Sequence, residues 1–386
     1  MSRLNVSNLF NENEDGAPVV SGISTFSSPN YFVPPSGSTA QRPSSPGEGM
    51  IRFNTDSGHL EYYTGELWVD VIVNNNELGN QTDALGKSGG GIGVRGLIAG
   101  GITPTLLDSI NFISISTLGD GHNFGDLVAG TRLAAGCASA TRGLFGGGAS
   151  PSPSKTAKID FVTIASTGNA GDFGNLTVSR NQLAACSNQT RGIWGGGDGP
   201  SAISDVMDYV TIASTGNAVD FGNLIVATEQ VEGCSNSVRG LFGGGHNGSA
   251  NTNVIAYVTI STTGNAADFG DLTVARTFFA SCSNSTRGLY ASGFVSPANQ
   301  NIIDFVTIPT TGNAADFGDL TVARRNGRAA CSSPTRGIFA AGEDDSAITN
   351  TIDFVTIAST GNASDFGDLT SARQQSFACS NGHGGL

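Results

Sequence analysis

Short apolar segments alternate with turns rich in glycine, serine, asparagine and threonine along residues 95–386. Three such segments lie in one stretch: RGLFGGG at 142–148, IDFVT at 159–163 and DFGNL at 172–176. β-Branched and aromatic residues, which favour strands, dominate the second segment. The intervening TGNA at 167–170 is typical of a tight hairpin connection, because glycine and asparagine tolerate positive φ. No helical periodicity is evident, so the pattern predicts short β-strands.

This pattern occurs six times, with the Arg-Gly segments starting 47 to 49 residues apart. A D-F-G-[ND]-L motif (NFGDL in the first copy) and a single cysteine keep the same period. Three markers in phase identify a repeat architecture. The repeated arginines and cysteines, which we interpret as structural positions, are Arg95, Arg142, Arg191, Arg239, Arg287, Arg336, Cys137, Cys186, Cys234, Cys282, Cys331 and Cys379.

One repeat of about 48 residues accommodates four short strands, the size of one propeller blade. We therefore predict an all-β fold with a six-bladed β-propeller over residues 84–386. The last repeat ends just after a first strand, and the first repeat begins with a second strand, so we expect the C-terminal strand to complete the first blade. A β-solenoid is the competing architecture, although its repeating units are usually shorter.

The order of an arginine, a strand ending in Gly-Gly, a third strand and a fourth strand resembles Kelch-type repeats over about three quarters of the chain. D-F-G-D-L stands where those repeats usually have tryptophan. The sequence TRGLFGGG…IDFVTIASTGNAxDFGDLTVAR is similar to repeat proteins of tailed bacteriophages, notably cyanophages. This resemblance implies a Kelch-like propeller in a virion structural protein.

Residues 1–82 lack the repeat, and we divide them into an attachment segment (1–33) and a Pro/Ser-linked β module (34–82). Three short strands are expected near 49–55, 59–63 and 66–71. The sequence QRPSSPGEGMIRFNTDSGHLEYYTGELWVDV at 41–71 resembles a small module of phage tail-fibre and other virion proteins. The resemblance implies docking to other virion proteins or homo-oligomerisation, for example as a trimer. A degenerate seventh blade is the alternative.

The net charge of −13 argues against nucleic acid as a partner, because phosphate binding needs clustered lysine and arginine. The N-terminus lacks the apolar core of a secretory signal, and no apolar run approaches the 18 residues of a membrane span. We therefore expect no membrane insertion, assembly in the host cytoplasm and a final location in the virion.

The glycine runs do not match a phosphate loop, since strands flank them on both sides and no Gly-Lys-Ser/Thr occurs. We expect each repeated arginine to anchor a neighbouring blade through carbonyls or the D-F-G aspartate. The cysteines lie in small-residue segments without Cys-x-x-Cys spacing, which favours compact buried side chains. The histidines His59, His122, His246 and His383 are not at ligand spacing. We therefore predict no catalytic residues, metal site or cofactor, and no enzyme activity.

The repeats differ most in the second-to-third loops and in the fourth-to-first connections. In a four-stranded meander both sets lie on one face of the disc, and such loops are where ligands are bound. Drift in surface loops is the alternative explanation. The candidate receptor-binding residues are Lys155, Asp198, His246, Asn247, Phe278, Phe279, Arg325, Arg328, Glu343 and Asp344.

These observations predict a non-enzymatic phage virion protein, a tail-fibre or tail-tip component that attaches to host-surface glycan or protein through the variable loops. The first alternative is an architectural capsid, neck or fibre protein without a host ligand. The second alternative is a glycan-active enzyme on a Kelch-like propeller.

Overall fold

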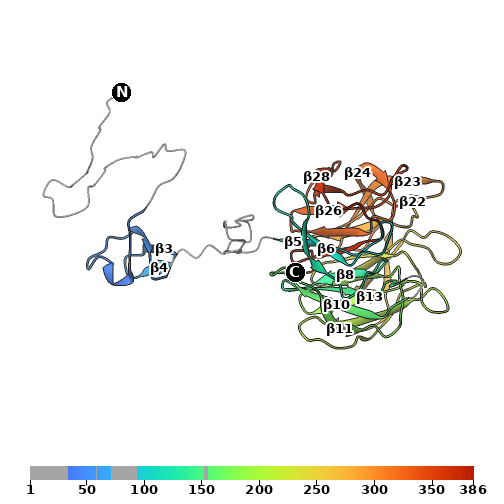
Figure 1. Cartoon of the computed structure of the whole chain (residues 1–386), viewed down its shortest axis with the longest axis horizontal. Coiled ribbons are helices and arrows are strands. Elements are labelled where there is room, and N and C mark those ends of the chain that lie inside the picture. The colour runs from blue at the N-terminus through green and yellow to red at the C-terminus, as the bar shows by residue number, and fades with distance from the viewer. Residues whose placement is uncertain (1–33, 58, 71–93, 152–154) are drawn as a thin grey trace, which may run out of the picture. The chain divides into compact units, whose positions relative to one another are not determined.

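The computed structural model describes residues 34–57, 59–70, 94–151 and 155–386 (Figure 1). The chain divides into two compact units, Met1–Asn74 and Asn75–Leu386, and each is described by itself. The predicted attachment segment 1–33, the end of the predicted β module and residues 84–93 of the predicted propeller lie outside the described residues.

The second unit is a six-bladed β-propeller built from antiparallel sheets of four strands, with one extra short strand in blade 5. Blade 1 contains β29 (Phe377–Ser380), β5 (Arg95–Ala99), β6 (Ser109–Ser114) and β7 (His122–Asp126). Blade 2 contains β8 (Ala135–Ala138), β9 (Arg142–Gly146), β10 (Lys158–Thr163) and β11 (Gly171–Asn175). Blade 3 contains β12 (Ala184–Ser187), β13 (Arg191–Gly195), β14 (Val206–Thr211) and β15 (Val219–Asn223).

The other three blades repeat this order. Blade 4 contains β16 (Glu232–Ser235), β17 (Arg239–Gly243), β18 (Val254–Thr259) and β19 (Ala267–Asp271). Blade 5 contains β20 (Ala280–Ser283), β21 (Arg287–Ala291), β23 (Ala298–Thr307) and β24 (Ala315–Arg324), with β22 (Phe294–Val295) pairing with β23. Blade 6 contains β25 (Ala329–Ser332), β26 (Arg336–Ala340), β27 (Thr351–Thr356) and β28 (Ser364–Asp368).

The first strands of the blades line the axis and form a closed ring in the order β8, β12, β16, β20, β25 and β29. The C-terminal strand β29 pairs with β5, from Phe377 opposite Ala99 to Ser380 opposite Gly96, and also packs against β8. In Figure 1 the C-terminus accordingly lies beside β5 and β8. The predicted closure of blade 1 is confirmed, and the ring is complete without a seventh blade.

The repeated arginines tie each blade to the next. Arg142 on β9 donates to the carbonyl of Ile212 in blade 3 at 3.2 Å, and its guanidinium stacks 5.1 Å from the Phe161 ring of its own blade. The other repeats make the same contact, and Arg336 of blade 6 closes the circle by donating to Ile115 of blade 1 at 3.0 Å. The expected anchoring through carbonyls is therefore confirmed.

A second set of interblade contacts joins each D-F-G strand to the following T-G-N-A turn. The Asn169 side chain accepts a hydrogen bond from the Asp126 N–H at 3.0 Å, and the Gly168 N–H donates to the Phe124 carbonyl at 2.8 Å. Equivalent side-chain bonds recur at every blade junction, with Asp120 in place of asparagine where blade 6 meets blade 1. The outer strands are thus bonded to the neighbouring blade as well as to their own sheet.

All six repeated cysteines are free and buried, as expected for compact side chains in a core. Each thiol fits against the glycine of the next blade's Arg-Gly segment. A methyl group at Gly192 would lie only 2.7 Å from the Cys137 sulfur, and the same notch occurs at every junction. The cysteine and the glycine therefore share one period because they fill the same space.

A ring of serine hydroxyls surrounds the axis where the first strands end. Five of these serines donate to the carbonyl of the preceding blade at 2.7 to 2.8 Å; they are Ser187, Ser235, Ser283, Ser332 and Ser380. The sixth position is Ala138, and there the His383 Nε2 lies 2.9 Å from the Ala138 carbonyl. Burial lowers the pKa of His383. The tail that follows β29 thus lies against this end of the axis.

The first unit is a four-stranded sheet in the order β1 (Ser36–Gly37), β2 (Ile51–Asn54), β3 (His59–Tyr63) and β4 (Trp68–Asp70), with the 3-10 helix η1 (Thr39–Gln41) between β1 and β2. The three predicted strands are confirmed, and β1 adds a parallel pairing to β2.

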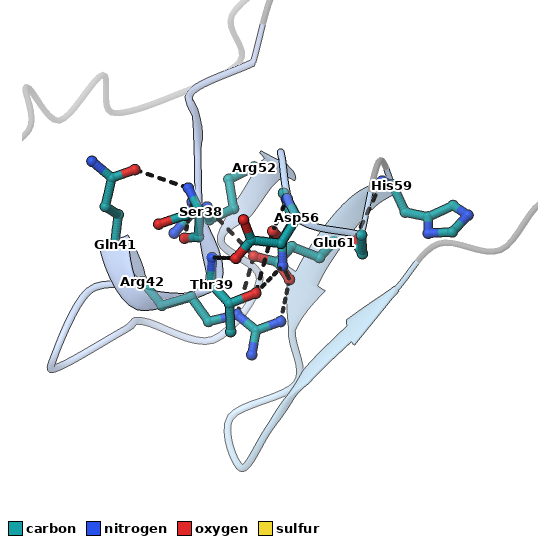
Figure 2. Close-up of polar contacts among 10 residues, drawn as sticks. Ser38, Thr39, Gln41, Arg42, Arg52, Asp56, His59 and Glu61 are labelled. Carbon is teal, nitrogen blue, oxygen red and sulfur yellow. Dashed lines mark hydrogen bonds and ion pairs between the residues drawn. The ribbon is translucent and has the colours of Figure 1, made fainter.

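The centre of this small sheet is polar (Figure 2). The Glu61 carboxylate is fully buried, lies 2.5 Å from the Arg42 guanidinium and 3.4 Å from Arg52, and accepts a bond from the Asn54 amide at 3.1 Å. The hydrogen bond from Arg42 is the main reason that the pKa of Glu61 is lowered. A buried ion cluster replaces the apolar core that so small a sheet cannot build.

The cysteine–glycine notch can be tested by a double-mutant cycle. Gly192→Ala should destabilise the propeller by about 1–3 kcal/mol, because the new methyl group overlaps the Cys137 sulfur and meets no other atom closer than 3.5 Å. In the Cys137→Ala background, the same Gly192→Ala substitution should destabilise the propeller clearly less. Thermal unfolding of the wild type, the two single variants and the double variant would measure this difference. Equal costs in the two backgrounds would contradict this packing.

Glu61→Gln should destabilise the N-terminal sheet by about 3–5 kcal/mol, because it removes the buried carboxylate charge opposite the buried Arg52 guanidinium and the half-buried Arg42 guanidinium. Hydrogen exchange on the full-length chain should then show lost protection in residues 51–63 and unchanged protection in the blades. Glu48→Gln, at an exposed glutamate of the same unit, is the matched control. Unchanged exchange at 51–63 would show that the cluster does not hold the sheet together.

Candidate functional site

The two variable loop sets lie on one face of the propeller, as predicted. Single backbone bridges join a fourth-to-first connection to a second-to-third loop at Asn181–Asp198, Glu229–His246 and Arg325–Glu343. The remaining blades contain equivalent bridges. We call this surface, formed by loops 148–151, 155–158, 197–206, 245–253, 293–301 and 342–350 with the connections before each first strand, the variable face.

Around the axis, the connections of the variable face share one strained backbone position. Its residues have φ of +57° or +58°, a conformation that side chains other than asparagine rarely adopt. At five of the six junctions the N–H of this residue donates to the carbonyl of its counterpart in the preceding blade, for example Gln182 to Leu133 at 2.9 Å. The six residues are Leu133, Gln182, Gln230, Phe278, Asn326 and Gln375.

Most charged candidates of the variable face are paired with each other. The Lys155 ammonium lies 2.7 Å from the Asp198 carboxylate of the next blade. Arg325 lies 2.6 Å from Glu343 and stacks 4.9 Å from the ring of Phe294 in blade 5. These pairs fix neighbouring loops relative to one another, so the face is polar but locally neutralised.

Two of the candidate receptor-binding residues, Asn247 and Asp344, stabilise turns in their own loops. The Asn247 side chain accepts the N–H groups of Ser249 and Ala250, and Asp344 does the same for Ser346 and Ala347. Hydrogen bonds from Ser346 and Ala347 lower the pKa of Asp344. Asn247 is exposed, Asp344 is half-buried, and His246 lies 3.7 Å from Glu229.

Two predicted contact residues are not at the surface. Phe279 is fully buried in the core beside Tyr290, whereas Phe278, one residue earlier, is half-buried on the variable face. The positive φ at Phe278 turns the chain so that only the second ring faces inward. Arg328 is 5% exposed and points toward the axis. Neither side chain is available to a ligand on the face.

Arg328 crosses the axis to blades that do not adjoin its own. It precedes β25 of blade 6, yet it lies 2.6 Å from Glu232 of blade 4 and donates to the carbonyls of Leu183 at 2.9 Å and Val231 at 3.1 Å. Burial raises the pKa of Glu232, and Arg328 opposes this shift. The cavity left along the axis measures about 70 Å³, a size that suits a few water molecules.

Sequence reasoning missed the glutamines that surround the axis. Gln182, Gln230 and Gln375 are half-buried on the variable face, and the Gln375 side chain accepts from Arg132 at 3.1 Å. Each glutamine lies four residues before the repeated cysteine, and this shared place in the repeat is the signal that could have identified them. The predicted contact residues are mostly charged or aromatic, so these glutamines are not among them.

Within the described residues, no group of three or more histidine, cysteine, aspartate or glutamate side chains is arranged to hold a metal ion. The described residues also contain no helix long and apolar enough to cross a membrane. Comparison with protein-family models and with curated proteins gives no match for this chain.

The ion pair across the axis has a testable pH signature. Arg328→Ala should destabilise the propeller by about 3–5 kcal/mol at pH 9, because Glu232 must then either bind a proton or remain a buried carboxylate without a counterion. Burial raises the pKa of Glu232 to about 7 although Arg328 opposes the shift, so removing Arg328 raises this pKa further and the loss relative to wild type should grow as pH rises above about 7.

Thermal unfolding of Arg328→Ala and of the wild type at pH 5 and pH 9 would measure this difference. The double variant Glu232→Gln/Arg328→Met, which removes both charges, should recover most of the stability at pH 9. A defect in Arg328→Ala that does not depend on pH would contradict the role of Glu232.

Proposed function

We propose that this chain is a non-enzymatic structural protein of a tailed-phage virion, a tail-fibre or tail-tip component that binds host-surface glycan or protein through the variable face. The observation that carries the proposal is the division of the propeller into two chemically different ends. Five serine hydroxyls repeat one bond at the first end, whereas diverse loops share the second.

The variable face offers the chemistry that such binding needs. Half-buried amides of Gln182, Gln230 and Gln375 surround the axis together with the Phe278 ring. Amide groups supply adaptable hydrogen bonds, and aromatic rings supply contact area at low entropic cost. The interblade ion pairs hold the loops in place, which lowers the cost of ordering them on binding. Several copies on one particle would multiply weak contacts.

The ion pairs themselves favour a second candidate, an architectural role in the virion without a host ligand. Lys155–Asp198 and Arg325–Glu343 satisfy charges within the protein that a receptor could otherwise use. This alternative keeps the proposed place in the particle, which the resemblance to phage proteins supports.

The receptor hypothesis predicts that the triple variant Gln230→Ala/Phe278→Ala/Gln375→Ala binds host cells at least about tenfold more weakly than the wild-type chain, as expected for the loss of several interface contacts. Binding of the labelled full-length protein to host cells and to a glycan array would measure this. The matched control is Gln189→Ala/Val238→Ala, at exposed positions in the first-to-second turns, which lie at the opposite end of the strands.

Two results would argue for the architectural role instead. One is no binding by the wild-type chain together with normal adsorption of particles that lack it. The other is equal binding by the triple variant and the control. Immunogold electron microscopy of particles would then place the protein on the tail, neck or head.

A further inference from the structure

Each junction between blades contains a buried position that an arginine fills in most repeats. Arg276, at the approach to β20, lies 2.6 Å from Asp304 of blade 5 and donates to the Tyr290 carbonyl at 3.0 Å. Arg180 pairs with Asp208, and Arg324 lies 2.9 Å from Asp353. In these three junctions the guanidinium and the carboxylate are both buried.

Two other junctions lack the buried arginine–aspartate pair, and neither retains the aspartate. At the approach to blade 4, Thr228 and Ala256 replace both partners, and the remaining cavity measures about 20 Å³. At the approach to blade 1, Arg373 is kept and Asn111 replaces aspartate, so the arginine donates to the Ser109 carbonyl at 3.2 Å.

The junction before blade 2 keeps the carboxylate and lacks the arginine. Thr131 stands at the arginine position, while Asp160 remains and is only 9% exposed. Val128 replaces the threonine that donates to the aspartate elsewhere, as Thr273 does to Asp304 at 2.5 Å. Among the described residues, Asp160 has a hydrogen bond from the Val128 N–H at 3.1 Å but no ion pair.

The side chains that would fill the space are also smaller here. Ala134 stands where blade 3 has Leu183 and blade 5 has Phe279. The result is a cavity of about 210 Å³, and its lining includes Thr131, Ala134, Phe145, Lys158, Asp160 and Phe377. An apolar protein cavity of about 150 Å³ can hold benzene, so this one has room for a guanidinium group and part of an aliphatic chain.

The acceptors for a guanidinium remain in place. The Phe145 carbonyl lies opposite Asp160 in the β9–β10 ladder, as the Tyr290 carbonyl lies opposite Asp304 in blade 5. The Lys158 carbonyl corresponds to that of Val206, which accepts from Arg180 in blade 3. Burial raises the pKa of Asp160, and the Val128 N–H and Lys158 oppose the shift.

We propose that the cavity beside Asp160 is a binding site for a guanidinium group supplied from outside the chain. Asp160 would accept two N–H groups, as carboxylates do from arginine, and the Phe145 and Lys158 carbonyls would accept the others. The lining includes Ser150 and Pro151 of the second-to-third loop, so the cavity reaches the variable face. The site does not depend on the proposed host receptor.

Calorimetric titration of the full-length chain with methylguanidinium, and with the neutral analogue methylurea, would test the site. We expect methylguanidinium to bind and methylurea not to bind. Asp160→Asn should weaken binding by about tenfold or more, because it removes a charge-assisted bond. The control Asp268→Asn, at an exposed carboxylate on β19 of blade 4, should leave binding unchanged.

Two further variants sharpen the test. Thr131→Arg should abolish binding and raise the thermal unfolding midpoint, because the chain then supplies its own guanidinium. Lys158→Gln should bind at least as tightly as the wild type, since it removes a competing cation. Binding of N-acetylarginine amide as well as methylguanidinium would indicate an arginine side chain as the ligand, and binding of methylguanidinium alone a free small molecule.

Three results would overturn the proposal: no binding of either guanidinium compound, equal binding by Asp160→Asn, or loss of binding in Lys158→Gln. Asp160→Asn keeps the test valid if Thr131→Arg fails to fold, because it removes a buried charge without adding volume.

Discussion

The propeller depends on bonds that each blade can make only with its neighbours. An arginine guanidinium, an asparagine side chain, a serine hydroxyl and a cysteine thiol each contact the adjoining blade, and most recur at every junction. A single four-stranded blade would leave these groups and both of its faces exposed to water. Each blade is therefore stabilised by its neighbours, and β29 completes the ring by pairing with β5.

This requirement explains which residues repeat. The glycine after each arginine admits the neighbouring thiol, and the arginine lies across an aromatic ring of its own blade while bonding to a carbonyl of the next. Substitution at one of these positions would disturb two blades at once. The loops of the variable face carry no such double constraint, so their sequences can differ without loss of the ring.

Much of this arrangement could be predicted from the sequence, because a repeated residue must do the same thing six times. The strand order, the closure by β29, the buried thiols and the arginine–carbonyl bonds all followed from period and residue type. The inward turn of Phe279 and Arg328 did not follow, because it depends on a positive φ at residues such as Phe278 that no local preference indicates. Blade 6 also contains one extra residue between Arg324 and Cys331, which helps Arg328 to reach the axis.

Positions at which one repeat differs from the others distinguish residues that serve only packing from residues with a specialised chemical role. A departure that serves only packing should be compensated, as at Thr228 and Ala256, where both partners of the ion pair are absent. The junction at Asp160 is not compensated. The carboxylate is present, but the arginine, the threonine hydroxyl and the large side chain at position 134 that other blades have are all absent. A buried carboxylate costs free energy unless it is paired. Among the described blade junctions, this one keeps a buried carboxylate beside an open cavity, and packing does not explain its retention.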